Sequence, residues 1–312
     1  MVKGKIVIDC DPGTDDALAI ILALSSEKID LKALCSVTGN GLIETTTKNG
    51  LKILTLCGRE DIPLYKGAKV ALDESEPETV SAFGEDGLGG YANTISVTKE
   101  VEEEYAPDFL AKYINEHPGE ITLFALGPCT NIAKAIRQSK EFAVNLKRLI
   151  IMGGAKSTGN VSPVAEYNFW ADPQAAHEVL QAGIKDVIII GLDVTNKIAL
   201  NCEKREVLRM MNTTLSTFVY NITREGLDEN WRNRKKAVSP MHDVLTVAYF
   251  MDESILDVKD AYIDVVTTGI AKGQSIVDIN GHWNNGMCNA KYAYNVDVDK
   301  FYSLFFESIF EK

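Results

Sequence analysis

Near its start the chain reads Val7-Ile8-Asp9-Cys10-Asp11-Pro12-Gly13-Thr14-Asp15-Asp16. Residues 5–8 contain three consecutive β-branched side chains, which predicts a strand buried on both faces. Pro12-Gly13 is typical of a turn and ends that strand. Residues 17–24 are apolar, rich in good helix formers and free of Gly and Pro, so a helix follows. We therefore expect Asp15 and Asp16 in or just before its first turn.

Four carboxylates, those of Asp9, Asp11, Asp15 and Asp16, fall within eight residues at this turn. One acidic residue at a helix start needs no further explanation, because it caps free N–H groups and complements the helix dipole. Four that lie so close repel one another and raise each other's pKa unless a cation lies among them. No Lys or Arg occurs in residues 6–27. A bound divalent cation is the simpler explanation, and all-oxygen ligands favour Ca²⁺ or Mg²⁺.

The composition limits the classes of protein to consider. With 312 residues and 46% hydrophobic side chains, the chain can bury a large core, as one large α/β domain or two ordinary ones. The net charge of −12 argues against a nucleic-acid partner. Six cysteines without a CxxC pair indicate buried, reduced thiols. Because no signal-peptide pattern or bilayer-length apolar run occurs, we expect a cytoplasmic protein with no membrane partner.

Beyond the first helix, buried apolar runs alternate with helical segments. Predicted strands cover residues 31–37, 121–126, 149–152 and 187–190, with a short extended piece at 63–65. Predicted helices cover residues 45–57, 105–115, 132–137 and 172–180. The last begins with Asp172 as N-cap and Pro173 at its first position. This alternation predicts an α/β fold with a mostly parallel central sheet flanked by helices.

The C-terminal part is predicted to be mostly helical. Helices are expected at residues 204–211, 215–224, 242–250 and 300–310, and late strands at 262–266 and 291–296. Residues 71–90 form a long polar loop, either a lid over a binding site or a solvated surface excursion. Residues 230–236 are expected to form an exposed basic loop. No repeat or linker is visible, so we expect one domain over residues 1–312.

Residues 9–16 resemble the DxDPGxDD signature of the inosine–uridine-preferring nucleoside hydrolase family. Val37-Thr38-Gly39-Asn40 resembles its VxGN, residues 125–133 its GPLTNIA, residues 151–154 its MGG, residues 159–173 its GN…AEFN…ADP block, and His242-Asp243 its HD pair. These segments occur in the family's order, which makes a chance match very improbable. The resemblance implies a Rossmann-like nucleoside hydrolase fold. It also implies an N-ribosylhydrolase that splits small-molecule purine or pyrimidine ribonucleosides in nucleoside salvage.

The resemblance also implies the roles of individual residues. Carboxylates of Asp11, Asp16 and Asp243 and the backbone carbonyl of Leu126 would bind one Ca²⁺. Asp11 would also take a proton from the attacking water, and His242 would protonate the leaving base. The expected substrate-binding residues are Asp15, Asn40, Met152, Asn160, Glu166 and Asn168. Turn formation or capping is the alternative role for each Asn taken singly.

One position departs from the family's pattern. Some pyrimidine-cleaving members carry a second His in the loop that corresponds to residues 82–87, where this chain has Phe83. Phe83 cannot transfer protons, which argues against efficient pyrimidine hydrolysis. It can stack on a base, so a purine preference does not follow and the base preference stays open. It also stays open whether residues 230–236 contact the base. We expect a homodimer or homotetramer.

Two other functions compete with this interpretation. A metal-dependent phosphatase with a DxDxT motif is disfavoured, because Gly13 stands where the Thr is required. A non-catalytic nucleoside- or Ca²⁺-binding protein is disfavoured, because Asp11 and His242 are both present.

Overall fold

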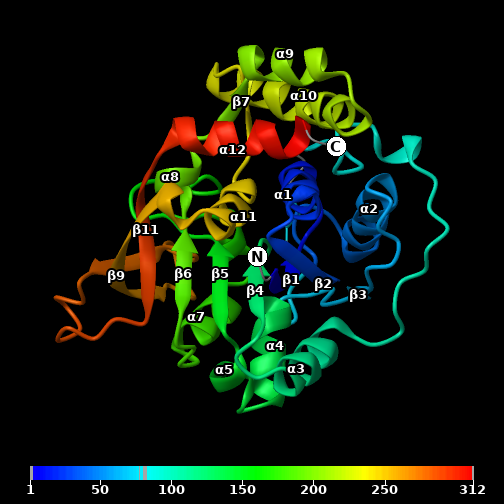
Figure 1. The fold of residues 1–312 in the computed structure, drawn as a ribbon. Helices are drawn as coiled ribbons and strands as arrows, with labels where there is room; N and C mark the ends of the chain where they lie inside the picture. Colours follow the sequence, from blue (N-terminus) through cyan, green and yellow to red (C-terminus); the bar gives the residue numbers. More distant parts are fainter. Residues whose placement is uncertain (1–2, 77, 80–82, 311–312) are drawn as a thin grey trace.

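The computed structural model describes residues 3–76, 78–79 and 83–310 and is built around a nine-stranded sheet (Figure 1). Its strands lie in the order β10 (Ser275–Ile279), β9 (Leu256–Val265), β11 (Ala290–Val296), β6 (Val187–Ile190), β5 (Arg148–Met152), β4 (Thr122–Ala125), β1 (Gly4–Cys10), β2 (Ile29–Ser36) and β3 (Leu64–Lys66). All neighbours from β11 across to β3 are parallel, whereas β9 pairs antiparallel with β11 and β10. The predicted mostly parallel α/β fold is confirmed.

Helices cover both faces of this sheet (Figure 1). They are α1 (Thr14–Ser25), α2 (Ile43–Leu56), α3 (Ala106–Glu116), α4 (Thr130–Gln138), α5 (Phe142–Asn145), α6 (Tyr167–Ala171), α7 (Pro173–Gln181), α8 (Leu192–Thr195), α9 (Cys202–Met211), α10 (Thr214–Arg234), α11 (Val244–Met251) and α12 (Val298–Phe310). Apolar residues of α1, α11 and α12 share one core cluster, and those of α3, α4 and α7 share the other. The sheet therefore separates two hydrophobic cores.

Strand β1 illustrates why the buried strands were recognisable. Ile6 and Ile8 lie in one core and Val7 lies in the other, and all three side chains are fully buried. Successive side chains of a strand point to opposite faces, so a strand covered on both sides must be apolar at every position. The same reasoning applies to β6, whose four residues are all buried.

The C-terminal part contains more strand than expected. β9 begins at Leu256, six residues before the predicted strand, and β10 was not predicted. A separate two-stranded sheet, β7 (Ala199–Asn201) with β8 (Val238–Pro240), was not predicted either. Asp257, Lys259 and Asp260 of β9 are all exposed, so the first half of this strand is open to solvent. A search for continuous apolar runs does not detect such strands.

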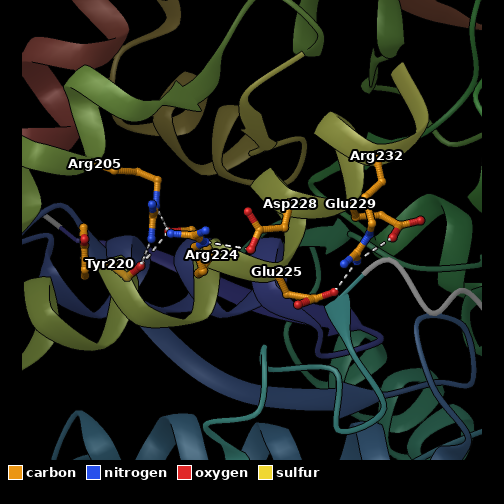
Figure 2. Close-up of polar contacts among 8 residues, drawn as sticks. Arg205, Tyr220, Arg224, Glu225, Asp228, Glu229 and Arg232 are labelled. Carbon is orange, nitrogen blue, oxygen red and sulfur yellow. Dashed lines mark hydrogen bonds and ion pairs between the residues drawn. The ribbon is translucent and has the colours of Figure 1, made fainter. Parts of the chain in front are cut away.

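The expectation of a basic loop at residues 230–236 is wrong for most of its length, because α10 continues to Arg234. Figure 2 shows why charged side chains suit this helix. Arg224 Nε donates to Asp228 at 2.7 Å, and Arg232 Nη2 contacts Glu225 and Glu229 at 2.6 and 3.0 Å. Such pairs, three, four or seven residues apart, lie along one helix face. Residues 231–236 are exposed, as expected.

The loop at residues 71–90 is partly held by its own side chains. Asp86 accepts hydrogen bonds from the amides of Leu88, Gly90 and Ala92, each at 2.9 Å. Residues 77 and 80–82 of this loop, Ala82 included, lie outside the described residues.

Two further sequence expectations concern thiols and membrane helices. Cys10, Cys35 and Cys129 are buried, but Cys202 and Cys288 are exposed, which corrects the expectation of buried thiols for those two. Among the described helices, none combines the length and apolarity needed to cross a membrane.

Candidate functional site

The predicted site residues meet at the carboxyl edge of the parallel strands. Asp11 follows β1, Asn40 follows β2, Leu126 follows β4 and Met152 ends β5. The order of the strands reverses between β1 and β4, since β2 and β3 continue on one side of β1 while β4 and β5 lie on the other. Open α/β folds bind ligands at such a switch point.

An acidic cluster lies at the bottom of the site. Carboxylate oxygens of Asp15 and Asp16, in the first turn of α1, and of Asp243, before α11, lie within 4.8 Å of one another. All three side chains are buried. Asp16 also accepts from the amides of Gly13 at 3.0 Å and Asp11 at 3.2 Å. Asp16 therefore caps the start of α1 and belongs to the cluster at once, so the two explanations of this motif do not exclude each other.

Asp11 lies beside this cluster, confined between Gly39 and Gly127. A Cβ on Gly39 would lie 2.0 Å from Asp11 Oδ2, and a Cβ on Gly127 would lie 2.6 Å from Oδ1. Oδ2 accepts from the Asn40 amide at 2.6 Å, whereas Oδ1 is buried without a hydrogen-bond partner. Asp15 Oδ1 is likewise buried and unpaired. Unpaired, buried carboxylate oxygens are costly in a protein interior unless a cation binds them.

Burial changes the acidity of the whole group. Burial and the neighbouring Asp16 hold the pKa of Asp11 well above its usual value, and burial with Asp15 does the same for Asp243. Burial raises the pKa of Asp16 to about 6. It raises that of Asp9 to about 8, although Asp9 accepts from Asn131 Nδ2 at 2.6 Å. The donor set is all oxygen and anionic when deprotonated, so these residues fit a hard divalent cation.

The residues expected to bind ribose are held in place by backbone contacts. Glu166 caps α6 by accepting from the amides of Gly154, Asn168 and Phe169 at 2.9, 2.8 and 3.2 Å. Asn168 Nδ2 donates to the carbonyl of Leu126 at 2.7 Å and to that of Met152 at 3.0 Å. A predicted substrate residue thus contacts the carbonyl that was predicted to bind metal.

Asn160 and Tyr167 complete this wall of the site. Asn160 Oδ1 accepts from the amide of Tyr167 at 3.0 Å. The hydroxyl of Tyr167 lies 2.8 and 2.9 Å from the carbonyl oxygens of Gly39 and Glu78, which share its one hydrogen. These bonds join the wall to the strand-end loop that confines Asp11.

His242 lies directly before Asp243 and lines the cavity. Its Nδ1 is 2.8 Å from the hydroxyl of Thr195, a buried residue at the end of α8. Burial, and next the charge of Arg234, lower the pKa of His242 to about 4. The ring is therefore neutral near pH 7 and carries one N–H.

These groups surround one cavity of about 330 Å³. Every predicted site residue lines it except Asp11 and Asp16, which lie beneath, and Phe83 is part of its wall. The last turns of α10 supply residues that were not predicted: Gly226, Glu229, Asn230, Asn233 and Arg234. Their spacing of three to four residues is the signal of a single helix face, which the assumption of a loop concealed.

Tyr167 and Thr195 were also missed. Tyr167 stands between Glu166 and Asn168, which is a usable signal. Thr195 offers none, since a Thr at the end of a short helix is ordinary.

The model of the family described as inosine-uridine preferring nucleoside hydrolase matches residues 6–303. The chain belongs to this family. It is therefore an enzyme of the nucleoside hydrolase class, and the family resemblance of the sequence is confirmed.

The names of relatives of this nucleoside hydrolase give different substrate preferences. Pyrimidine-specific ribonucleoside hydrolase RihA of Citrobacter koseri is 36% identical, over 88% of each chain. The solved structure of a plant nucleoside hydrolase, PpNRh1, has a TM-score of 0.94 at 32% identity and covers 100% of both chains. The purine-preferring ribonucleoside hydrolase of Gardnerella vaginalis has a TM-score of 0.91 at 29% identity, over 98% of both chains.

Proposed function

We propose that this nucleoside hydrolase uses one Ca²⁺ ion to hydrolyse the N-glycosidic bond of ribonucleosides, releasing ribose and the free base. One observation carries the proposal. A single cavity has buried, partly unpaired carboxylates at one end and His242 in its wall. Hydrolysis of a ribonucleoside requires both the carboxylates and a hydrogen-bond donor, because water must be activated at the sugar carbon while the base leaves from the opposite side of that carbon.

The proposed ligands of the cation are Asp11, Asp16, Asp243 and the carbonyl of Leu126. Asp15 lies next to Asp16 and Asp243 and lines the cavity, so its negative charge adds to the charge that offsets that of the cation. When bound, the cation supplies positive charge that lowers the pKa of a water molecule and holds ribose hydroxyls. The unpaired oxygens of Asp11 and Asp15 support this role.

The chain's own groups would carry out the remaining steps. Asp11 accepts a proton from the attacking water, whose oxygen bonds to the anomeric carbon as the bond to the base breaks. The ribose hydroxyls contact Asp15, Asn40, Met152, Asn160, Glu166 and Asn168. The surrounding carboxylates stabilise the positive charge that develops on the sugar ring, as in other glycoside cleavage.

His242 would assist the departure of the base. The N–H of its neutral ring donates a hydrogen bond to the base nitrogen or oxygen that gains electrons. The base leaves as an anion stabilised by this bond and then takes up a proton from solvent water. Phe83 offers an aromatic face on which the base can stack. Its place in the cavity wall supports contact but gives no preference between purines and pyrimidines, and the relatives' names point in both directions.

The test is an assay of the purified protein with inosine, uridine and inosine 5′-monophosphate, with free base and phosphate measured separately. We expect base from the nucleosides, little from the nucleotide and no phosphate. We also expect chelation to abolish turnover and Ca²⁺ to restore it. Release of phosphate, or nucleoside turnover that survives complete metal removal, would contradict the proposal.

We further propose a cytoplasmic homodimer or homotetramer that works in nucleoside salvage. Several free thiols in the described residues suit a reducing compartment. Sedimentation of the native protein tests the assembly, and a monomer at micromolar concentration would contradict it.

A further inference from the structure

Thr195 belongs to a short element with no role in the reaction described so far. α8 follows β6 and packs against β11. Asp193 Oδ2 accepts from the Tyr292 hydroxyl at 2.5 Å and from the amide of Lys156 at 2.8 Å. A Cβ on Gly191, at the start of α8, would lie 2.6 Å from the carbonyl oxygen of Gly154. These contacts fix the position of α8, and therefore of Thr195.

The bond between Thr195 and His242 has a preferred direction. The hydroxyl has one hydrogen to donate, and Nδ1 of the imidazole either carries a hydrogen or can accept one. Within the described part of the chain, the hydroxyl of Thr195 makes one hydrogen bond, to His242 Nδ1, 2.8 Å away. If Nδ1 carried the hydrogen, the buried hydroxyl would keep its own hydrogen unpaired, which is unfavourable. The hydroxyl therefore donates to Nδ1, and Nε2 carries the hydrogen.

The free side of the His242 ring faces the cavity. Thr195 is 1% exposed, whereas His242 keeps part of its surface open and lines the cavity. With Nδ1 held by Thr195, the Nε2–H is the group that the ring can offer to a ligand. The bond also restrains rotation of the ring.

We infer that Thr195 is a positioning residue of this hydrolase, whose hydroxyl selects the tautomer and orientation in which the Nε2–H of His242 donates a hydrogen bond to the leaving base. This inference rests on the proposed function. No covalent step involves Thr195 itself, since its hydroxyl keeps its hydrogen while the bond between ribose and base breaks.

Three variants distinguish the effect of the Thr195 hydroxyl from that of the side-chain volume. Thr195→Val removes the hydroxyl and keeps the volume, Thr195→Ser keeps the hydroxyl, and Thr195→Ala removes it in a smaller side chain. Each is assayed on inosine, which needs help for its leaving group, and on 4-nitrophenyl riboside, which releases a stable phenolate without a proton. Thermal unfolding and bound Ca²⁺ are measured for each variant as controls for folding and metal geometry.

We expect Thr195→Val and Thr195→Ala to lower kcat on inosine roughly tenfold, part of the ~10²–10⁴-fold that a general acid contributes. KM on inosine and turnover of the nitrophenyl riboside should change little. Thr195→Ser should retain kcat on inosine. In a His242→Ala background, Thr195→Val should have no additional effect on inosine.

Several outcomes would overturn the inference. Equal losses on both substrates would make Thr195 a structural residue only. Full activity of Thr195→Val on inosine would show that the hydroxyl is not needed. Failure of wild-type protein to release base from any ribonucleoside would instead remove the proposed function, and this inference with it.

Discussion

Asp11 has room for its carboxylate only because glycine stands on both sides of it. A Cβ on Gly39 or Gly127 would lie 2.0 or 2.6 Å from its oxygens, closer than van der Waals contact allows. Neither glycine has a positive φ, so the requirement is one of space rather than of backbone conformation. The two glycines follow β2 and β4, the strands on either side of β1, so the sheet itself confines the proposed catalytic base.

The first prediction concerns this confinement. Gly39→Ala should displace the Asp11 carboxylate and lower both Ca²⁺ affinity and kcat by at least ~10-fold, equivalent to about 1.4 kcal/mol. Gly41→Ala is the matched control in the same loop, because its Cβ would meet Thr45 at an ordinary 3.4 Å. Calcium titration and inosine turnover are the measurements. Equal behaviour of the two variants would mean that the site tolerates a displaced Asp11.

The second prediction concerns His242. His242→Ala should lower turnover of inosine by about 10²–10⁴-fold, the usual contribution of general acid catalysis, and that of 4-nitrophenyl riboside only slightly. His177→Ala is the control, since His177, on α7, contacts Asp264 of β9 and does not line the cavity. Kinetics on both substrates decide the matter. A uniform loss would point to disturbed metal geometry at the adjacent Asp243 instead.

Among the elements, α10 and the loop at residues 83–92 form one rim of the cavity together. Gly89 packs on the backbone of α10, where a Cβ would lie 2.7 Å from the carbonyl oxygen of Ile222. The Gly89 amide donates to the carbonyl of Phe83 at 2.8 Å. On α10, Arg232 holds Glu225 and Glu229, and Glu229 lines the cavity (Figure 2). The position of Phe83 therefore depends on how closely this loop packs against α10.

The third prediction tests that packing. Gly89→Ala should push the loop off α10, move Phe83 and lower kcat/KM for nucleosides by ~10-fold or more, about 1.4 kcal/mol. Gly90→Ala is closely matched, because both glycines have positive φ but nothing lies within 4 Å of a Cβ at Gly90. Any difference between the variants then reports the contact rather than backbone strain. Identical kcat/KM values would show that the loop and α10 move independently.

For the molecule as a whole, the buried carboxylates make stability depend on pH and on the cation. Raised pKa values, about 6 for Asp16 and about 8 for Asp9, mean that the metal-free folded protein binds more protons than the unfolded chain. Its stability is then fully present at acidic pH and falls as pH rises through these values. His242 acts in the opposite sense, but only between pH 4 and 6.5, where its lowered pKa differs from the ordinary one.

The fourth prediction follows for the range from pH 6.5 to 8, where His242 contributes nothing. Metal-free protein should lose thermal stability across this range, and the rise in Tm caused by Ca²⁺ should be larger at pH 8 than at pH 5, because binding at low pH must displace protons. Calorimetry with and without Ca²⁺ measures both. We expect one transition, as for a single domain over residues 1–312. A Ca²⁺ effect independent of pH would contradict the proposed ligands.

The sequence by itself determined the parallel core and the identity of most cavity residues. Strands such as β1 and β6 are buried on both faces, so every position is apolar and the pattern is local. The motif around Asp11, Asp15 and Asp16 is equally local, because strand, turn and helix follow one another within a few residues. Family resemblance extended that reading to distant residues, including Asp243, which the structure brings next to Asp15 and Asp16.

Only the tertiary structure decided the edges of the sheet and the far wall of the cavity. β9 and β10 lie at the partly exposed edge of the sheet and carry charged residues such as Lys259 and Asp278, so no continuous apolar run reveals them. The last turns of α10 look like a basic loop in sequence, and only their packing over the site shows that Asn230 and Asn233 line the cavity. Thr195 reaches His242 from 47 positions away. Contacts between distant segments leave no local periodicity, which is why the sequence could not reveal them.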